Sequence, residues 1–135
     1  MRFDDFFKER KVVRCRPDKE WAKALLKMSD ASLDAANALD TERNSSAALT
    51  LAYTALRQVL EAICLLRGYK VYSHEAYTSF LKELDEPAAA ESFNRFRKLR
   101  NGVEYYARPV SAAVAHQALK GITTIRKRLR EKYAK

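Results

Sequence analysis

The stretch from Ser45 to Gly68 carries the clearest helical pattern in the chain. Its apolar side chains recur at three- and four-residue steps, on Leu49, Ala52, Tyr53, Leu56, Val59, Leu60, Ile63 and Leu66. This spacing places them on one wide face of a helix, and Gly68 suits the left-handed position that commonly closes a helix. Because so apolar a helix must be covered by other elements, we predict that it lies at the centre of the core.

Similar spacing predicts helices over roughly residues 18–39, 73–84, 87–108 and 111–133, with Ser73 and Ser111 as N-caps and Pro87 in a first turn. The sequence has only 3 Gly and 3 Pro, and no segment alternates as a strand would, which argues against an all-β fold. We therefore predict one all-α domain over residues 17–135, an up-and-down bundle of about five helices. Residues 1–16 form either an arm or a short helix docked through Phe3, Phe6 and Phe7.

Apolar runs, the N-terminal residues and the two cysteines indicate the cellular compartment. The longest unbroken apolar run, Ala62 to Leu66, has five residues, so no membrane span is predicted. The first eight residues include acids where a signal peptide needs an apolar stretch, and we therefore expect a cytoplasmic protein. In that compartment Cys15 and Cys64 are expected to be free thiols.

The net charge of +9 is concentrated at the two ends of the chain. Residues 1–27 carry 9 basic and 5 acidic groups, residues 120–135 carry 7 and 1, and residues 28–119 carry 10 and 11. Basic ends around a neutral body suit a polyanion such as RNA, or an acidic partner protein. The alternative is that the charge only keeps a small protein soluble.

The sequence offers few sites for standard catalytic chemistry. His74 and His116 are 42 positions apart, and neither has metal ligands at the usual spacing around it. There is no glycine-rich phosphate loop and no nucleophile motif. No metal and no cofactor are therefore expected, and His116 is predicted to be a partly buried, hydrogen-bonded side chain.

The predicted fourth helix is the most distinctive segment, with four basic residues within six positions: Arg95, Arg97, Lys98 and Arg100. Gly102 follows in mid-helix, where it is unfavourable, and so is expected to permit close approach of a neighbouring backbone or ligand. One interpretation is an exposed basic face with ion pairs such as Arg100–Glu104. The other is a polar cleft lined by Arg100, Asn101 and the nearby tyrosines.

Several short motifs together resemble a HEPN domain over about residues 20–133. They are the run from Tyr53 to Ala62, Gly68-Tyr69, Ser73-His74-Glu75, Leu99-Arg100-Asn101 and Tyr105-Tyr106. The resemblance implies an all-α up-and-down bundle that forms homodimers. It also implies a nucleotidyltransferase partner encoded nearby, often as a toxin–antitoxin pair. Many members of this family cleave RNA without a metal, using an arginine, a polar residue and a histidine four to six positions further on.

Arg100 and Asn101 match the first half of that motif, but Tyr105, Tyr106 and Ala107 stand where the histidine would be. A phenol is a poor base at neutral pH. We therefore predict a binding module that presents RNA, a nucleotide or a partner protein with a polar cleft.

The predicted binding residues are Arg97, Lys98, Arg100, Asn101 and Tyr105. A ribonuclease using Arg100 with Tyr105, Tyr106 or a distant histidine is one alternative, and a plain helical scaffold is another. His74 is assigned a structural or capping role.

Overall fold

The computed structural model describes residues 1–134 and contains six helices and one small sheet. The elements are α1 (Phe3–Lys8), β1 (Val12–Arg14), α2 (Lys19–Ala38), α3 (Ser45–Leu66), β2 (Tyr69–Val71), α4 (Glu75–Glu83), α5 (Pro87–Tyr106) and α6 (Ala112–Tyr133). The predicted all-α bundle is confirmed, with the five expected helices present and α1 in addition.

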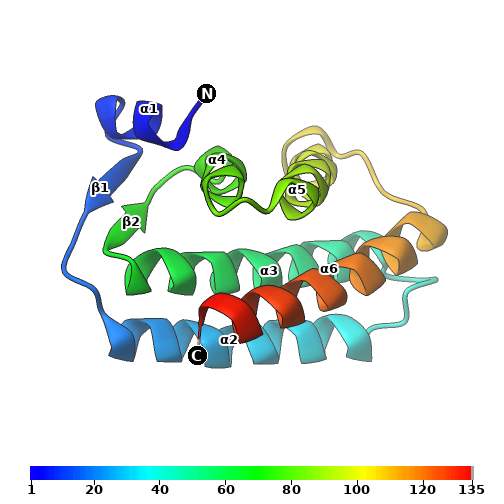
Figure 1. The fold of residues 1–135 in the computed structure, drawn as a ribbon. Coiled ribbons are helices and arrows are strands. Elements are labelled where there is room, and N and C mark those ends of the chain that lie inside the picture. The colour runs from blue at the N-terminus through cyan, green and yellow to red at the C-terminus, as the bar shows by residue number, and fades with distance from the viewer. Residues whose placement is uncertain (135) are drawn as a thin grey trace.

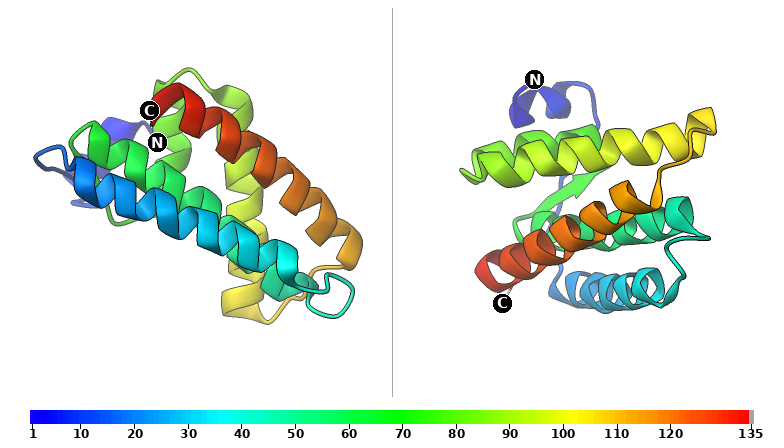
Figure 2. Two further views of the ribbon diagram at one scale, coloured as in Figure 1. Left: turned by 90° about the horizontal axis from the view of Figure 1, so that it is seen from below. Right: turned by 90° about the vertical axis from the view of Figure 1, so that its right-hand side faces the viewer.

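The long helices form two layers (Figure 1). In one layer α2 and α6 run alongside α3, while in the other α4 and α5 cross over α3 and are seen end-on. The two turned views agree, and they show α5 lying across α3 and α6 (Figure 2). The helices α4 and α5 therefore form a layer that covers one side of α3.

The core is built around α3, as its apolar pattern predicts. Thirteen of its 22 residues are buried, and Leu49, Leu56, Leu60 and Ile63 have no exposed surface. Burial of each such side chain contributes about 1.5–3 kcal/mol relative to exposure. Among the described helices α3 alone is long and apolar enough to cross a membrane, and 67% of its most apolar window is buried in this fold, as in a core helix.

Most predicted helix ends are correct, and the exception concerns α4. The Asp18 side chain accepts a hydrogen bond from the Trp21 backbone N–H, and Ser111 accepts one from Val114. Ser73 was predicted to cap α4, but the helix begins at Glu75 with His74 at the N-cap position and no side-chain cap. The His74 ring is engaged elsewhere and leaves that helix end uncapped.

The first residues of the chain fold onto the body of the protein. Phe3 and Phe6 of α1 are buried, and the Phe3 ring lies 5.3 Å from the rings of both Tyr69 and Phe80. The strand β1 pairs antiparallel with β2, with Val12 opposite Val71. The sequence did not indicate this strand pair, because three-residue strands are too short to show alternation in a sequence.

Gly68 ends α3 and leaves space for the backbone at Cys15, which leads into α2. Its φ of +83° is a left-handed conformation, as predicted for the end of this helix. A Cβ atom added here would lie 2.9 Å from the Cys15 carbonyl oxygen. The Gly68 carbonyl accepts a hydrogen bond from the Cys15 N–H at 2.8 Å. Glycine is thus required at this position by the backbone conformation and by the space available.

The two cysteines, Cys15 and Cys64, are free thiols, as predicted.

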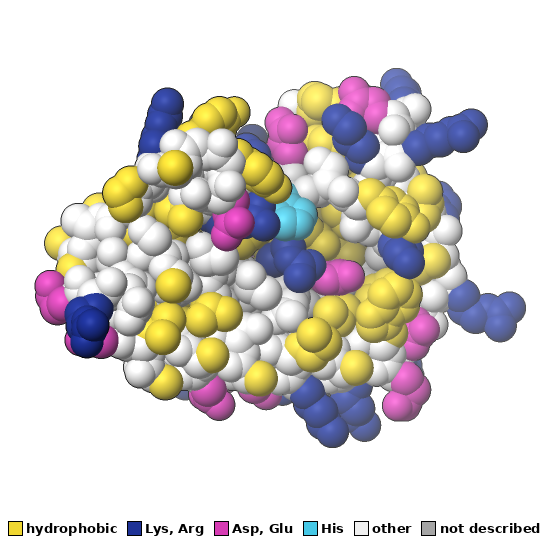
Figure 3. All heavy atoms as spheres, turned by 180° about the vertical axis from the view of Figure 1, so that it is seen from behind, with side chains coloured by type: hydrophobic (Ala, Val, Ile, Leu, Met, Phe, Trp, Pro, Cys, Tyr) yellow, Lys and Arg dark blue, Asp and Glu magenta, His cyan; other side chains and the backbone are white. Residues whose placement is uncertain are grey.

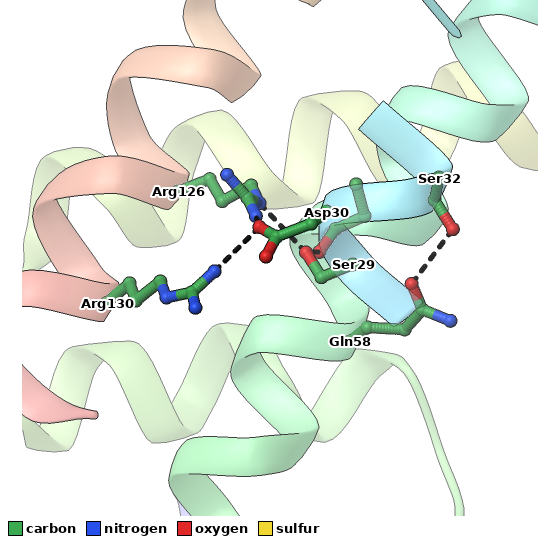
Figure 4. A network of polar contacts seen from close by, with 7 residues as sticks. Ser29, Asp30, Ser32, Gln58, Arg126 and Arg130 are labelled. Atoms are coloured by element: carbon green, nitrogen blue, oxygen red, sulfur yellow. Dashed lines mark hydrogen bonds and ion pairs between the residues drawn. The ribbon is translucent and has the colours of Figure 1, made fainter. Parts of the chain in front are cut away.

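A buried polar network joins α2, α3 and α6 (Figure 4). The Arg126 guanidinium donates to the Ser29 hydroxyl at 2.8 Å and forms an ion pair with Asp30. Ser29 in turn donates to the Ala55 carbonyl at 2.6 Å, and Arg130 pairs with Asp30 at 2.6 Å. These bonds satisfy polar groups that the apolar core could not otherwise accommodate.

Replacement of Arg126 should therefore destabilise the fold. We expect Arg126→Ala to lower the free energy of unfolding by about 2–3 kcal/mol, because it removes buried hydrogen bonds and leaves Ser29 with a lost partner. Lys127 is exposed on the same helix, and Lys127→Ala should change stability by less than about 0.5 kcal/mol. Urea unfolding monitored by circular dichroism measures both, and equal effects of the two variants would contradict this role for Arg126.

Candidate functional site

Three arginines and a histidine meet where α3, α4 and α5 approach one another. Tyr53 and Arg57 come from α3, His74 precedes α4, and Arg97 and Arg100 come from α5. We call these five residues the Arg100 cluster. The His74 Nδ1 atom lies 2.9 Å from the Tyr53 hydroxyl, and the Arg100 guanidinium carbon lies 5.6 Å from the centre of the Tyr53 ring.

One face of the molecule is hollowed, and Figure 3 shows a histidine in this hollow, with Lys or Arg side chains and acidic side chains beside it. The arginines that act on the charge of His74 are Arg57, Arg97 and Arg100. The Arg100 cluster is thus formed by residues from distant parts of the sequence.

Positive charge exceeds negative charge in the Arg100 cluster. Arg57 forms an ion pair with Glu61 at 2.7 Å. Arg97 donates to the neutral Asn94 side chain at 2.8 Å, and no carboxylate pairs with it among residues 1–134. Within the described residues Arg97 therefore has only a neutral partner, and the same holds for Arg100.

Arg100 contacts neutral groups of its own helix. Its Nη1 atom donates to Asn101 at 3.3 Å and lies 3.5 Å from the Tyr105 hydroxyl. The ion pair with Glu104 that the helical spacing allows does not form within the described chain. The Nε atoms of Arg97 and Arg100 are buried without a hydrogen-bond partner. Such unpartnered buried donors are uncommon in proteins.

His74 and Tyr53 are both neutral at pH 7. Burial, followed by the positive charges of Arg57, Arg100 and Arg97, lowers the pKa of His74 from 6.5 to about 4. Burial raises the pKa of Tyr53 to about 12, although Arg100 acts against the rise. The neutral imidazole therefore adds no charge to the three guanidinium groups, and one of its nitrogens is occupied by Tyr53.

The predicted site residues separate into two groups. Arg97 and Arg100 lie in the cluster, and Asn101 and Tyr105 contact Arg100. Lys98 faces away from them and lines a different groove of α5.

Tyr106 also lies apart, because its ring lies under the Arg108 guanidinium at 5.4 Å. The Tyr105 and Tyr106 side chains are each 67% exposed. Only Tyr105 is therefore placed to assist a ligand held by Arg100.

The sequence reasoning missed Tyr53, Arg57 and the position of His74 in the site. His74 has a side chain that binds Tyr53 rather than capping α4. A usable signal was present, because Arg57 is the single basic residue of α3 and follows Tyr53 by one turn. His116 was also misjudged, since it is exposed and lies 3.9 Å from Glu42. Its helix turns this side chain to the surface.

Within residues 1–134 no neighbouring backbone approaches Gly102 closely, so this part of the prediction is wrong, and the predicted approach of a ligand stays a prediction. A Cβ atom added there would meet only Arg108, at 3.7 Å. This is an ordinary van der Waals contact, so packing does not require glycine at this position.

Most of the basic residues near the C-terminus have structural partners. Arg126 and Arg130 pair with Asp30, while Arg128 and Lys132 pair with Glu86 at 2.9 and 3.0 Å. Burial raises the pKa of Glu86, but hydrogen bonds from Tyr133 and Lys132 outweigh it and hold that pKa below its usual value. The basic segment 120–135 therefore offers much less free positive charge than its composition indicates.

Comparison with known proteins adds no relative: no family model, no curated protein and no solved structure matches the chain.

The lowered pKa of His74 predicts a specific pH dependence of stability. Between pH 6.5 and pH 4 the unfolded chain binds a proton at His74 and the folded chain does not. The contribution of His74 is therefore complete above pH 6.5 and is lost progressively as the pH falls towards 4.

We expect wild type to lose about 1 kcal/mol more stability than His74→Gln between pH 7.5 and 5.0, after allowance for solvent screening. Urea unfolding at the two pH values measures this difference. Parallel losses in both proteins would show that His74 titrates normally.

Proposed function

We propose that the protein is a HEPN-type binding module that holds RNA phosphate groups at Arg97 and Arg100. The observation that carries the proposal is the pair of neighbouring guanidinium groups that have no carboxylate partner within residues 1–134. Guanidinium binds phosphate through two parallel hydrogen bonds, and each charge-assisted bond contributes about 1.5–3 kcal/mol.

Tyr105 supports RNA as the ligand in preference to a simple anion. Its ring is largely exposed and its centre lies 5.6 Å from the Arg100 guanidinium carbon. An exposed aromatic ring beside a phosphate-binding group suits the stacking of an unpaired base. Single-stranded RNA carries both phosphate groups and unpaired bases.

The sequence resemblance supports the proposed setting of this module. In that setting the chain forms a homodimer and works with a small nucleotidyltransferase in a toxin–antitoxin-type pair. Tyr105 and Tyr106 at the end of α5 supply exposed aromatic surface near the Arg-Asn motif through which the family pairs.

Metal-independent ribonuclease activity is the second candidate, and the position of His74 is the observation that favours it. His74 and Arg100 lie in one cluster, so a histidine from outside the motif stands near its arginine. A neutral imidazole can accept the proton of a ribose 2′-hydroxyl. With a pKa of about 4, however, His74 is a weak base at pH 7. We therefore rank cleavage below binding.

Loss of Arg100 should weaken RNA binding. We expect Arg100→Ala to raise the Kd for a fluorescent 12-nucleotide single-stranded RNA about 10- to 100-fold, measured by anisotropy at low salt. Arg100→Lys should show an intermediate effect, because it keeps the charge and loses the two-pronged geometry. Lys120 is an exposed cation on α6, and Lys120→Ala supplies the control for the change in net charge.

A Kd that rises no more for Arg100→Ala than for Lys120→Ala would overturn the proposed site. RNA binding that is absent at low salt in wild type would overturn the proposed function itself.

Wild type should cut RNA negligibly in the presence of a chelator, because His74, with a pKa of about 4, is a weak base at neutral pH. Tyr105→His restores the spacing of the HEPN motif and should produce weak cleavage. The assay follows a 5′-labelled RNA on a denaturing gel, with His116→Gln as a control. Robust cleavage by wild type that both His74→Gln and Arg100→Ala abolish would place the ribonuclease first.

A further inference from the structure

A second surface of α5 forms a groove against the loop that leads into α6. The groove has a volume of about 490 Å³ and is lined by Glu91, Asn94, Arg95, Lys98, Leu99, Gly102, Arg108, Pro109 and Val110. None of these residues belongs to the Arg100 cluster. We call this surface the α5 groove, and the function proposed above does not use its lining residues.

The α5 groove carries an excess of positive charge. Arg95, Lys98 and Arg108 are exposed, and within residues 1–134 none of them forms an ion pair. Glu91 is the single acidic residue of the lining. The guanidinium of Arg95 lies over the Phe96 ring at 5.1 Å, which helps to hold the side chain in place.

The floor of the α5 groove is apolar. Leu99 and Val110 are partly buried and pack against the core, and Pro109 adds its ring beside them. Because Gly102 has no side chain, the groove stays open at this point of the helix, where an added Cβ would meet only Arg108.

Backbone hydrogen bonds fix the wall of the α5 groove in advance. Ala107 adopts the left-handed conformation with φ of 50°, and the Arg108 N–H donates to the Gly102 carbonyl at 2.9 Å. On the other side the Val110 N–H donates to the Ser46 hydroxyl at 3.1 Å, and the Ser45 hydroxyl donates to the Val110 carbonyl at 2.7 Å. A preformed wall lowers the entropy that a ligand must lose on binding.

We propose that the α5 groove docks an acidic peptide segment of a partner protein, with one apolar side chain as its anchor. Carboxylates of the segment pair with Arg95, Lys98 and Arg108, and the anchor covers Leu99, Pro109 and Val110. Charge complementarity favours an acidic occupant. The groove favours peptide over RNA, because its floor is apolar and none of its described lining residues offers an aromatic ring for stacking.

The test uses fluorescein-labelled ten-residue peptides composed of Asp, Glu, Gly and one central Leu, titrated with the full chain. Two matched peptides replace every Asp and Glu by Asn and Gln, or the Leu by Ser. We expect the acidic Leu peptide to bind, and each matched peptide to bind at least tenfold more weakly.

Gly102→Leu is the decisive variant, because it adds a side chain to the lining of the groove and removes a glycine from a helix, and its Cβ atom would make only an ordinary contact with Arg108 at 3.7 Å. It should abolish peptide binding while the melting temperature stays equal or rises. Ala113 is exposed on α6, and Ala113→Leu controls for an added exposed leucine. Lys98→Glu should also abolish binding, whereas Lys120→Glu, with the same change in charge, should not.

Three results would overturn the proposal: equal binding of the three peptides, binding that survives both Gly102→Leu and Lys98→Glu, or loss of RNA binding in place of peptide binding in these variants. RNA and peptide are separate titrations. A failure at the Arg100 cluster therefore leaves the peptide result intact, and a failure at the α5 groove leaves the RNA result intact.

Discussion

Enclosure of α3 is the constraint on which the rest of the structure depends. A helix with apolar residues on most of its circumference cannot face water on more than one narrow side. Here α2 and α6 cover it from one layer and α4 and α5 from the other. The polar side chains that α3 does carry are therefore forced to the boundaries between helices. Gln58 bonds to Ser32 of α2, and Arg57 reaches the boundary with α4 and α5.

The same enclosure explains why the candidate site has its unusual electrostatics. Tyr53 is buried because it belongs to the apolar face of α3, and it fixes the His74 ring through one hydrogen bond. Arg97 and Arg100 reach the same place from α5, where they find amide and hydroxyl groups in place of carboxylates. Partial burial strengthens the mutual effects of these charges and keeps the imidazole neutral. The result is positive charge in a position where it is not balanced internally.

Basic residues serve two different purposes in this fold. Those near the C-terminus mostly hold helices together, since Arg126 and Arg130 bind Asp30 and Lys132 binds Glu86. Those of α5 are bound by neutral groups or by none. Because α5 carries cations on more than one face, it contributes to two separate sites, the Arg100 cluster and the α5 groove. The two proposals made above use these two faces separately, RNA at the Arg100 cluster and an acidic peptide at the α5 groove.

The sequence by itself determined the helices, their order and the central place of α3, because helical periodicity is a local property that repeats every few residues. It also indicated Arg100, Asn101 and Tyr105 as neighbours, since they lie within two turns of one helix. Only the tertiary structure decided that His74 joins them, that Lys98 does not, and that β1 pairs with β2. Those outcomes depend on contacts between residues far apart in the chain, which no local pattern encodes. The same reason explains why the sequence overstated the free positive charge of the basic C-terminal segment. Its charge can be counted from the sequence, but its partners Asp30 and Glu86 lie on other parts of the fold.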